Sequence, residues 1–256
     1  MTVLLIDLGN TALKWTTMDK PDEPHTYVHG GNDAVSQELL ETWLGLSVTH
    51  VVGCMVSSET LALTLTRFFN QHGIAWEWLH SQERFSGQFT LVNRYKNCQQ
   101  LGSDRWHAAI GAAGLYSKEA LLVVHMGTAT TVDTILPEKN HLEFLGGRIL
   151  PGPLMMYDAL IHGTRCRPKG VVSIEDFPST TDAAISTAIL EAHLGVFDRA
   201  IKAIERRGFQ AKFVFAGGAA PTFAAYIQAE YPGAILKHNM VLRGLALRAS
   251  SLLETR

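Results

Sequence analysis

The chain has little of what marks secreted, membrane-spanning or nucleic-acid-binding proteins. Its 256 residues include only three cysteines, far apart and without a CxxC pair. We therefore expect reduced thiols in a cytoplasm, and neither a disulfide framework nor a zinc site. The formal net charge is −2, so no basic excess favours nucleic acid or anionic lipid as a partner. No apolar run approaches the length of a membrane span, so we expect no membrane partner.

The opening segment also lacks the features of a signal peptide. Its apolar run is short, is stopped by Asp7, and follows no basic segment, so we expect no cleaved leader. Hydrophobic residues make up 46% of the chain and charged residues 18%, which allows a packed core. The length suits one large domain or two small ones.

Two stretches of the chain look like copies of one pattern. LLIDLGNT from residue 4 and LLVVHMGTATT from residue 121 each place a hydrophobic strand before a turn that contains glycine and threonine, and more strand follows. We therefore predict an α/β protein of two related halves, residues 1–117 and 118–256, with a cleft between them.

Periodicity and breaker residues predict the elements around these turns. Residues 180–208 carry the longest helical pattern, and Ser57 and Ser58 are expected caps of the helix that follows them. Residues 81–103 are polar, and we expect them to be irregular. Asp104 is expected to be the N-cap of the next helix.

The first turn has the residue types of a phosphate site. Asp7 could hold a hydrated magnesium ion, Gly9 lets a phosphate approach the backbone, and the following Asn10, Thr11 and Lys14 offer donors. A strand-to-turn junction capped by Asp and Asn would give the same pattern. The first motif alone leaves both interpretations open.

Two further glycine turns are equally ambiguous when each is taken alone. The small residues and hydroxyls of GTATT at 127–131 suit a phosphate, but they also suit tight strand packing. FAGGAA at 215–220 could pass under a nucleotide or could be an ordinary β–α turn.

A pair of such turns on two half-repeats is more specific, because phosphoryl transfer depends on positioning and on a metal-balanced phosphate cradle. It also needs a base for the attacking hydroxyl. Asp104 at a helix start could be that base, and Arg105 could clamp an anion such as a carboxylate. A plain capping aspartate would look the same.

Six stretches in order carry a family resemblance. The chain resembles the type III pantothenate kinases, of the acetate-kinase/sugar-kinase/Hsp70/actin superfamily. The stretches are IDLGNTALKW at 6–15, NRYKNCQQLGSDRWHAAIGA at 93–112, GTATTVD at 127–133, FLGGRILPG at 144–152, TTDAAISTA at 180–188 and FAGGAA at 215–220. The resemblance implies a duplicated ribonuclease-H-like (actin-like ATPase) fold.

The same resemblance implies an activity. It is the ATP-dependent phosphorylation of pantothenate to 4'-phosphopantothenate, the first step of coenzyme A biosynthesis. The resemblance also implies ATP with Mg²⁺, a monovalent cation (K⁺ or NH₄⁺), and a cytoplasmic homodimer with pantothenate bound near the subunit interface.

Site residues follow from the resemblance, position by position. Asp104 would be the general base, Asp7 would hold Mg²⁺ directly or through water, and Asp133 is a further candidate for the metal. The implied contacts with the ATP phosphates are Asp7, Gly9, Asn10, Thr11, Lys14, Gly127, Thr128, Thr130 and Thr131. The implied contacts with pantothenate are Tyr95, Gly102, Arg105 and Thr181, with Arg105 on the carboxylate.

One position departs from the family pattern. The second turn usually begins Asp-x-Gly-Thr-Ala, but this chain has His125 in place of the aspartate. A neutral imidazole is a poor ligand for magnesium, and a protonated one repels it. Besides the active kinase, two alternatives stay open. One is a weakly active or inactive homologue that acts as an accessory or regulatory binding protein, and the other is a kinase or phosphatase for another small molecule.

Overall fold

The computed structural model describes residues 2–56, 59–165 and 173–253. Its elements, in chain order, are β1 (Thr2–Leu8), β2 (Ala12–Thr17), β3 (His25–Val28), α1 (Gln37–Gly45), β4 (Val48–Met55), α2 (Glu59–Gln71), β5 (Ala75–Trp78), β6 (Arg84–Ser86), β7 (Thr90–Asn93), η1 (Cys98–Gln100), α3 (Ser103–Leu115), β8 (Ala120–Met126), β9 (Ala129–Glu138), β10 (His141–Pro151), α4 (Pro153–Gly163), α5 (Thr181–Glu205), β11 (Ala211–Ala216), α6 (Ala220–Glu230), β12 (Ile235–Leu236) and α7 (Met240–Leu253).

The chain forms two compact units that are discontinuous in sequence. The first contains Met1–Lys118, Pro137–Leu145 and His238–Arg256, and the second contains Glu119–Leu136 and Gly146–Lys237. The C-terminal helix α7 therefore belongs with the N-terminal part of the chain. Among the described residues, no helix is both long enough and apolar enough to cross a membrane.

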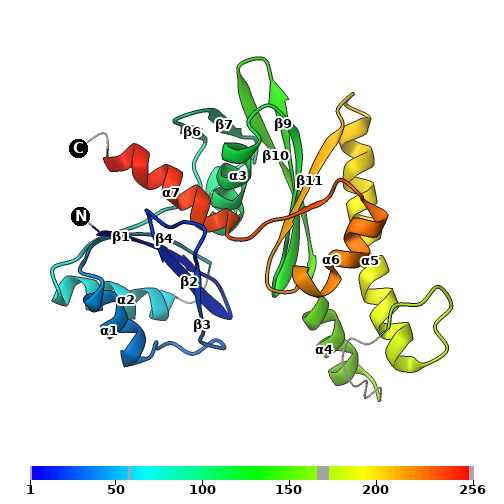
Figure 1. The fold of residues 1–256 in the computed structure, drawn as a ribbon, viewed down its shortest axis with the longest axis horizontal. Helices are drawn as coiled ribbons and strands as arrows, with labels where there is room; N and C mark the ends of the chain where they lie inside the picture. The colour runs from blue at the N-terminus through cyan, green and yellow to red at the C-terminus, as the bar shows by residue number, and fades with distance from the viewer. Residues whose placement is uncertain (1, 57–58, 166–172, 254–256) are drawn as a thin grey trace. The chain divides into compact units, whose positions relative to one another are not determined.

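The first unit is built on a five-stranded sheet in the order β3-β2-β1-β4-β5. β1, β4 and β5 run parallel, and β2 and β3 are antiparallel additions. Successive side chains of β1 point to opposite faces of the sheet. Leu4, Ile6 and Leu8 join the cluster that includes residues of α1 and α2, so Asp7 lies on the other face. Figure 1 shows α1 and α2 on one side of this sheet and α7 on the other.

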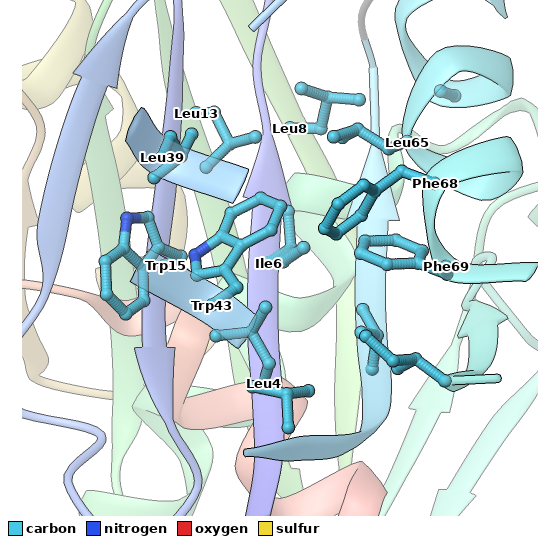
Figure 2. Packing of buried hydrophobic residues seen from close by; sticks show 14 of the residues in the cluster. Leu4, Ile6, Leu8, Leu13, Trp15, Leu39, Trp43, Leu65, Phe68 and Phe69 are labelled. Atoms are coloured by element: carbon cyan, nitrogen blue, oxygen red, sulfur yellow. The ribbon is translucent and has the colours of Figure 1, made fainter. Parts of the chain in front are cut away.

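Aromatic residues fill the space between this sheet and helices α1 and α2. Figure 2 shows Trp43, Phe68 and Phe69 pointing toward the β1 leucines and Ile6. The rings of Trp43 and Trp15 meet edge to face at 6.0 Å. Such pairs add about 0.5–1.5 kcal/mol to the free energy of area burial. The cluster therefore fixes β1, and with it the position of Asp7 on the opposite face.

Glycines allow α3 and α7 to pack with their backbones in contact. A Cβ atom on Gly111 would lie 2.0 Å from the Met240 carbonyl oxygen, and one on Gly244 would lie 1.9 Å from the His107 carbonyl oxygen. Any larger residue at either position would force the helices apart. This packing fixes α3, whose first turn carries Asp104.

The second unit contains strands of a seven-stranded sheet whose order is β12-β11-β8-β9-β10-β7-β6. β8 pairs antiparallel with β9 and parallel with β11. Helix α5 contacts β8 and β11 (Figure 1), and Phe197 of α5 meets Phe213 of β11 edge to face at 5.4 Å. The prediction of a long helix ahead of Gly208 is confirmed, since α5 ends at Glu205 and Gly208 has a φ of 82°.

Two local predictions are wrong, and one cannot be compared. Residues 81–103 are not irregular, because β7 pairs with both β6 and β10. β10 lies about 50 residues after β7 in sequence, so the local polarity of residues 81–103 does not predict their pairing. Asp104 is not an N-cap, since Gly102 holds that position and Asp104 is the second residue of α3. Ser57 and Ser58 lie outside the described residues.

Candidate active site

The first glycine turn follows β1 and is closed by backbone hydrogen bonds. The Gly9 N–H donates to the Ala12 carbonyl over 3.1 Å. Asn10 and Thr11 are exposed and Lys14 is half-buried on β2. The turn thus presents polar groups to solvent on a fixed backbone, which is what an anion-binding turn requires.

Asp7 is a buried carboxylate close to several polar groups. Its register partners are Lys14 on β2 and Cys54 on β4, and the Cys54 Sγ donates to Asp7 Oδ1 over 3.9 Å. Burial raises the pKa of Asp7 to about 7, nearby Lys14 opposes this rise, and Asp104 adds to it. The positive charge of Lys14 therefore does not fully balance the buried negative charge of Asp7, and more positive charge is needed. A divalent cation would supply that charge, so the residue fits a magnesium ligand.

Asp104 is held at the start of α3 by backbone geometry. Its Oδ1 accepts from the Arg105 N–H over 2.8 Å. A Cβ atom on Gly102 would lie 2.6 Å from the same oxygen, so glycine at this N-cap leaves room for the carboxylate. The Ser103 hydroxyl donates to the Met55 carbonyl over 2.8 Å and ties α3 to β4. Burial raises the pKa of Asp104 above its usual value, although the Arg105 N–H bond partly offsets this.

Arg105 has its guanidinium enclosed by aromatic rings. Only 6% of the residue is exposed, and its Nη1 donates to the Tyr95 hydroxyl over 3.0 Å. The guanidinium carbon lies 5.6 Å from the centre of the Tyr95 ring and 6.0 Å from that of Phe144. A planar cation held in this way is suited to bidentate binding of a carboxylate. The structure brings Tyr95, Gly102, Asp104 and Arg105 together in the first unit.

The second glycine turn follows β8 and is enclosed by two other glycines. The Gly127 N–H donates to the Ala129 carbonyl, and the Gly152 N–H donates to the Thr128 carbonyl, each over 3.0 Å. A Cβ atom on Gly152 would lie 2.1 Å from the Gly127 oxygen, and one on Gly217, whose φ is 107°, would lie 2.3 Å from the Met126 oxygen. The strand-end glycines of FLGGRILPG and FAGGAA thus permit close backbone packing around this turn.

The strand register divides the polar residues of the second turn between two faces. His125 pairs with Thr131, and Met126 pairs with Thr130, so Thr131 shares the face of His125 while Thr130 points to the other. Thr130 is fully buried, and its Oγ1 lies 3.0 Å from Nε2 of His193 on α5. Thr128 is exposed and Thr131 is half-buried. The two outer threonines are therefore the accessible hydroxyls of this turn.

Asp133 and Thr181 take different positions in the second unit. Asp133 is 3% exposed, and a Cβ atom on Gly147 would lie 2.1 Å from its Oδ1, so the carboxylate lies against the β10 backbone. Thr181 is the exposed first residue of α5. Among the described residues, no three His, Cys, Asp or Glu side chains gather into a metal site.

The sequence did not predict three residues that lie near the turns. His29 and His193 bond to the first and second turns, and Cys54 bonds to Asp7. A histidine or cysteine outside a motif has no sequence signal of its own. The strand register brings Cys54 beside Asp7. The position of His193 on α5 brings it to Thr130.

Comparison with known proteins identifies consistent relatives. A family model described as type III pantothenate kinase matches residues 3–203. A type III pantothenate kinase from Janthinobacterium sp. (strain Marseille) is 35% identical over 257 residues, which cover 95% of this chain and 95% of the relative.

Solved structures give the same fold at lower identity. A Campylobacter jejuni protein named as a Baf family transcriptional activator has a TM-score of 0.62 at 23% identity, covering 97% of this chain and 99% of that one. The apo pSK41 ParM protein has a TM-score of 0.51 at 12% identity, covering 99% and 98%. These two likenesses concern the fold alone, and they confirm the predicted actin-like ATPase fold.

Proposed function

The chain belongs to the type III pantothenate kinase family, and on that premise we propose which of its residues carry the reaction. The protein phosphorylates pantothenate with ATP in the first step of coenzyme A biosynthesis. The observation that carries the assignment is the cluster in the first unit, where a buried carboxylate, Asp7, and a half-buried one, Asp104, lie near enough for Asp104 to raise the pKa of Asp7. Phosphoryl transfer needs one carboxylate for the metal and one for the proton.

Asp104 is the general base. The pantothenate hydroxyl oxygen forms a bond to the γ-phosphorus while the bond from that phosphorus to the β,γ-bridging oxygen breaks and ADP leaves. The hydroxyl proton goes to the Asp104 carboxylate. Since Oδ1 of Asp104 already accepts from the Arg105 N–H, Oδ2 is the oxygen that we assign to this proton.

We assign a set of candidate phosphate ligands to each unit. In the first unit these are Asp7, Gly9, Asn10, Thr11 and Lys14, and in the second they are Gly127, Thr128 and Thr131. Asp7 would hold Mg²⁺, which would supply charge neutralisation of the phosphates.

We also propose a homodimer and a monovalent cation site. The second unit exposes the apolar side chains of Ile149 at the end of β10 and of Leu154 and Met155 on α4, which suits a surface that is covered by a second copy. Asp133, which is buried against the β10 backbone, is a further candidate ligand for the metal ion. Thr181, exposed at the start of α5, is assigned to pantothenate.

The cation assignments are tested by assaying kinase activity with each cation withdrawn. The protein, dialysed free of metal, is assayed with pantothenate and ATP in the presence or absence of Mg²⁺, and with K⁺, NH₄⁺ or Na⁺ as the only monovalent cation. We expect no turnover without Mg²⁺. With Mg²⁺ present, we expect turnover in K⁺ or NH₄⁺ but not in Na⁺. Equal turnover in Na⁺ would remove the monovalent site, and no phosphopantothenate under any cation would favour the accessory-protein alternative that His125 suggests.

Arg105→Lys is expected to raise the KM for pantothenate about tenfold or more and to change the KM for ATP little, since lysine loses the planar fork and its stacking. The measurement is steady-state kinetics with each substrate varied. Arg94→Lys is the matched control, because Arg94 is an exposed arginine paired with Glu143 and plays no part in the proposed site. An unchanged KM for pantothenate in Arg105→Lys would remove the carboxylate role.

A further inference from the structure

The first glycine turn is held by a buried histidine. His29 is 4% exposed. Its Nε2 lies 3.0 Å from the Gly9 carbonyl oxygen, and its Nδ1 lies 3.2 Å from the Gly31 backbone nitrogen. A carbonyl can only accept and a backbone N–H can only donate, so both bonds form only when the ring is neutral with its proton on Nε2. The backbone N–H groups of His29 and Gly30 also donate to the Thr11 carbonyl, at 3.1 and 2.9 Å.

The second glycine turn has a buried histidine of the opposite tautomer. His193 is fully buried, and its Nδ1 lies 2.7 Å from the Ile189 carbonyl oxygen. The proton must therefore be on Nδ1, and Nε2 accepts from the Thr130 hydroxyl over 3.0 Å. Burial lowers the pKa of His193, which favours this neutral form. The Thr130 hydroxyl therefore donates its hydrogen bond to Nε2 of His193.

We propose that His29 and His193 are positioning residues that hold the two phosphate turns through tautomer-specific hydrogen bonds. The proposal rests on the proposed function, in which these turns bind the ATP phosphates. His29 fixes the backbone of the first turn directly at Gly9. His193 fixes Thr130, within the second turn, against α5. A turn ordered before ATP arrives loses less conformational entropy on binding, so its affinity for phosphate is higher.

This assignment changes the role of Thr130. Sequence resemblance places it among the phosphate ligands, but its hydroxyl is buried and donates to His193. Thr130 therefore acts on the turn through His193, and the phosphate contacts of this segment fall to Thr128 and Thr131.

The test compares leucine and glutamine at each histidine. His29→Leu and His193→Leu are each expected to raise the KM for ATP about tenfold, with little change in the KM for pantothenate, because one hydrogen bond to the turn is lost. Glutamine retains a donor for the Gly9 carbonyl at position 29 and an acceptor for Thr130 at position 193. His29→Gln and His193→Gln should therefore keep the KM for ATP within about threefold of the wild type.

His72→Leu is the matched control. Its Nδ1 bonds the carbonyl four residues earlier, Phe68, over 2.9 Å, as His193 does with Ile189, but it contacts neither turn. Its KM for ATP should not change. Denaturant unfolding of every variant measures stability alongside. Leucine variants that unfold more easily but keep a normal KM for ATP would reduce both histidines to structural residues and overturn the proposal.

Long-range ¹⁵N–¹H NMR correlations of the histidine rings supply a readout independent of activity. We expect the Nε2–H tautomer for His29 and the Nδ1–H tautomer for His193 in the wild-type protein. The same tautomer at both positions would overturn the proposal. Lys14→Ala tests the underlying function separately. An unchanged KM for ATP in that variant would contradict the phosphate role of the first turn, whereas the tautomers and the glutamine rescue concern the histidines alone.

Discussion

Asp104→Asn is expected to lower the turnover number about 10²- to 10⁴-fold, the range over which general bases contribute. Asparagine has the shape of aspartate and can still accept from the Arg105 N–H through its oxygen. It cannot take the proton of the pantothenate hydroxyl. The KM for ATP should change little, and single-turnover kinetics should place the loss in the chemical step.

The pH profile checks the same assignment. Burial raises the pKa of Asp104 above the ordinary aspartate value, and only the ionised form is a base. Turnover of the wild type should therefore fall as the pH drops through this raised pKa. The residual turnover of Asp104→Asn should not show this fall at low pH.

A control is available at an equivalent helix position. Glu38 is the second residue of α1, as Asp104 is of α3, so Glu38→Gln removes a first-turn acid without touching the site. Its turnover should stay at the wild-type value. If Asp104→Asn keeps turnover within threefold of wild type, another group takes the proton.

Asp7→Asn is expected to lower kcat/KM for ATP roughly 10²- to 10³-fold, because the residue loses the charge that holds Mg²⁺ against the phosphates. The Mg²⁺ concentration for half-maximal activity should rise, and calorimetry should show weaker binding of the Mg²⁺–ATP complex. Asp19→Asn, which removes an exposed carboxylate beyond β2, should behave as wild type.

The pH dependence of the Mg²⁺ requirement separates this role from simple packing. The pKa of Asp7 is about 7 in the metal-free protein, so below that pH a proton competes with the cation. The half-maximal Mg²⁺ concentration should rise as the pH falls from 8 to 6 in the wild type and should stay flat in Asp7→Asn. A wild-type requirement that does not change with pH would contradict metal binding by Asp7.

His125 poses a separate question, because its position decides what it can touch. It shares a sheet face with Thr131, and the Cβ of any residue replacing Gly127 would lie 3.4 Å from its Cε1. The ring therefore lies against the second turn, on the face opposite to Thr130. The ring is half-buried beside the turn and is not part of the buried core.

Local patterning was enough to predict several elements of the fold. A short hydrophobic run that ends in a glycine turn predicted β1, and apolar periodicity closed by Gly208 predicted α5, because a buried strand and an amphipathic helix need these patterns whatever they pack against. The two glycine turns were also predictable from their residue types, whereas their phosphate roles and the base role of Asp104 stay predictions. The division at residue 117 stays a prediction.

Contacts between groups that lie far apart in the sequence are seen only in the tertiary structure. The partner of β7 is β10, and the partner of α3 is α7, both set by packing that local propensity does not specify. Strand register placed Thr131 beside His125 and turned Thr130 toward His193. A one-residue alternation in the pleat thus gave adjacent threonines different surroundings, and it placed Thr130 beside a histidine that lies 63 residues away in sequence.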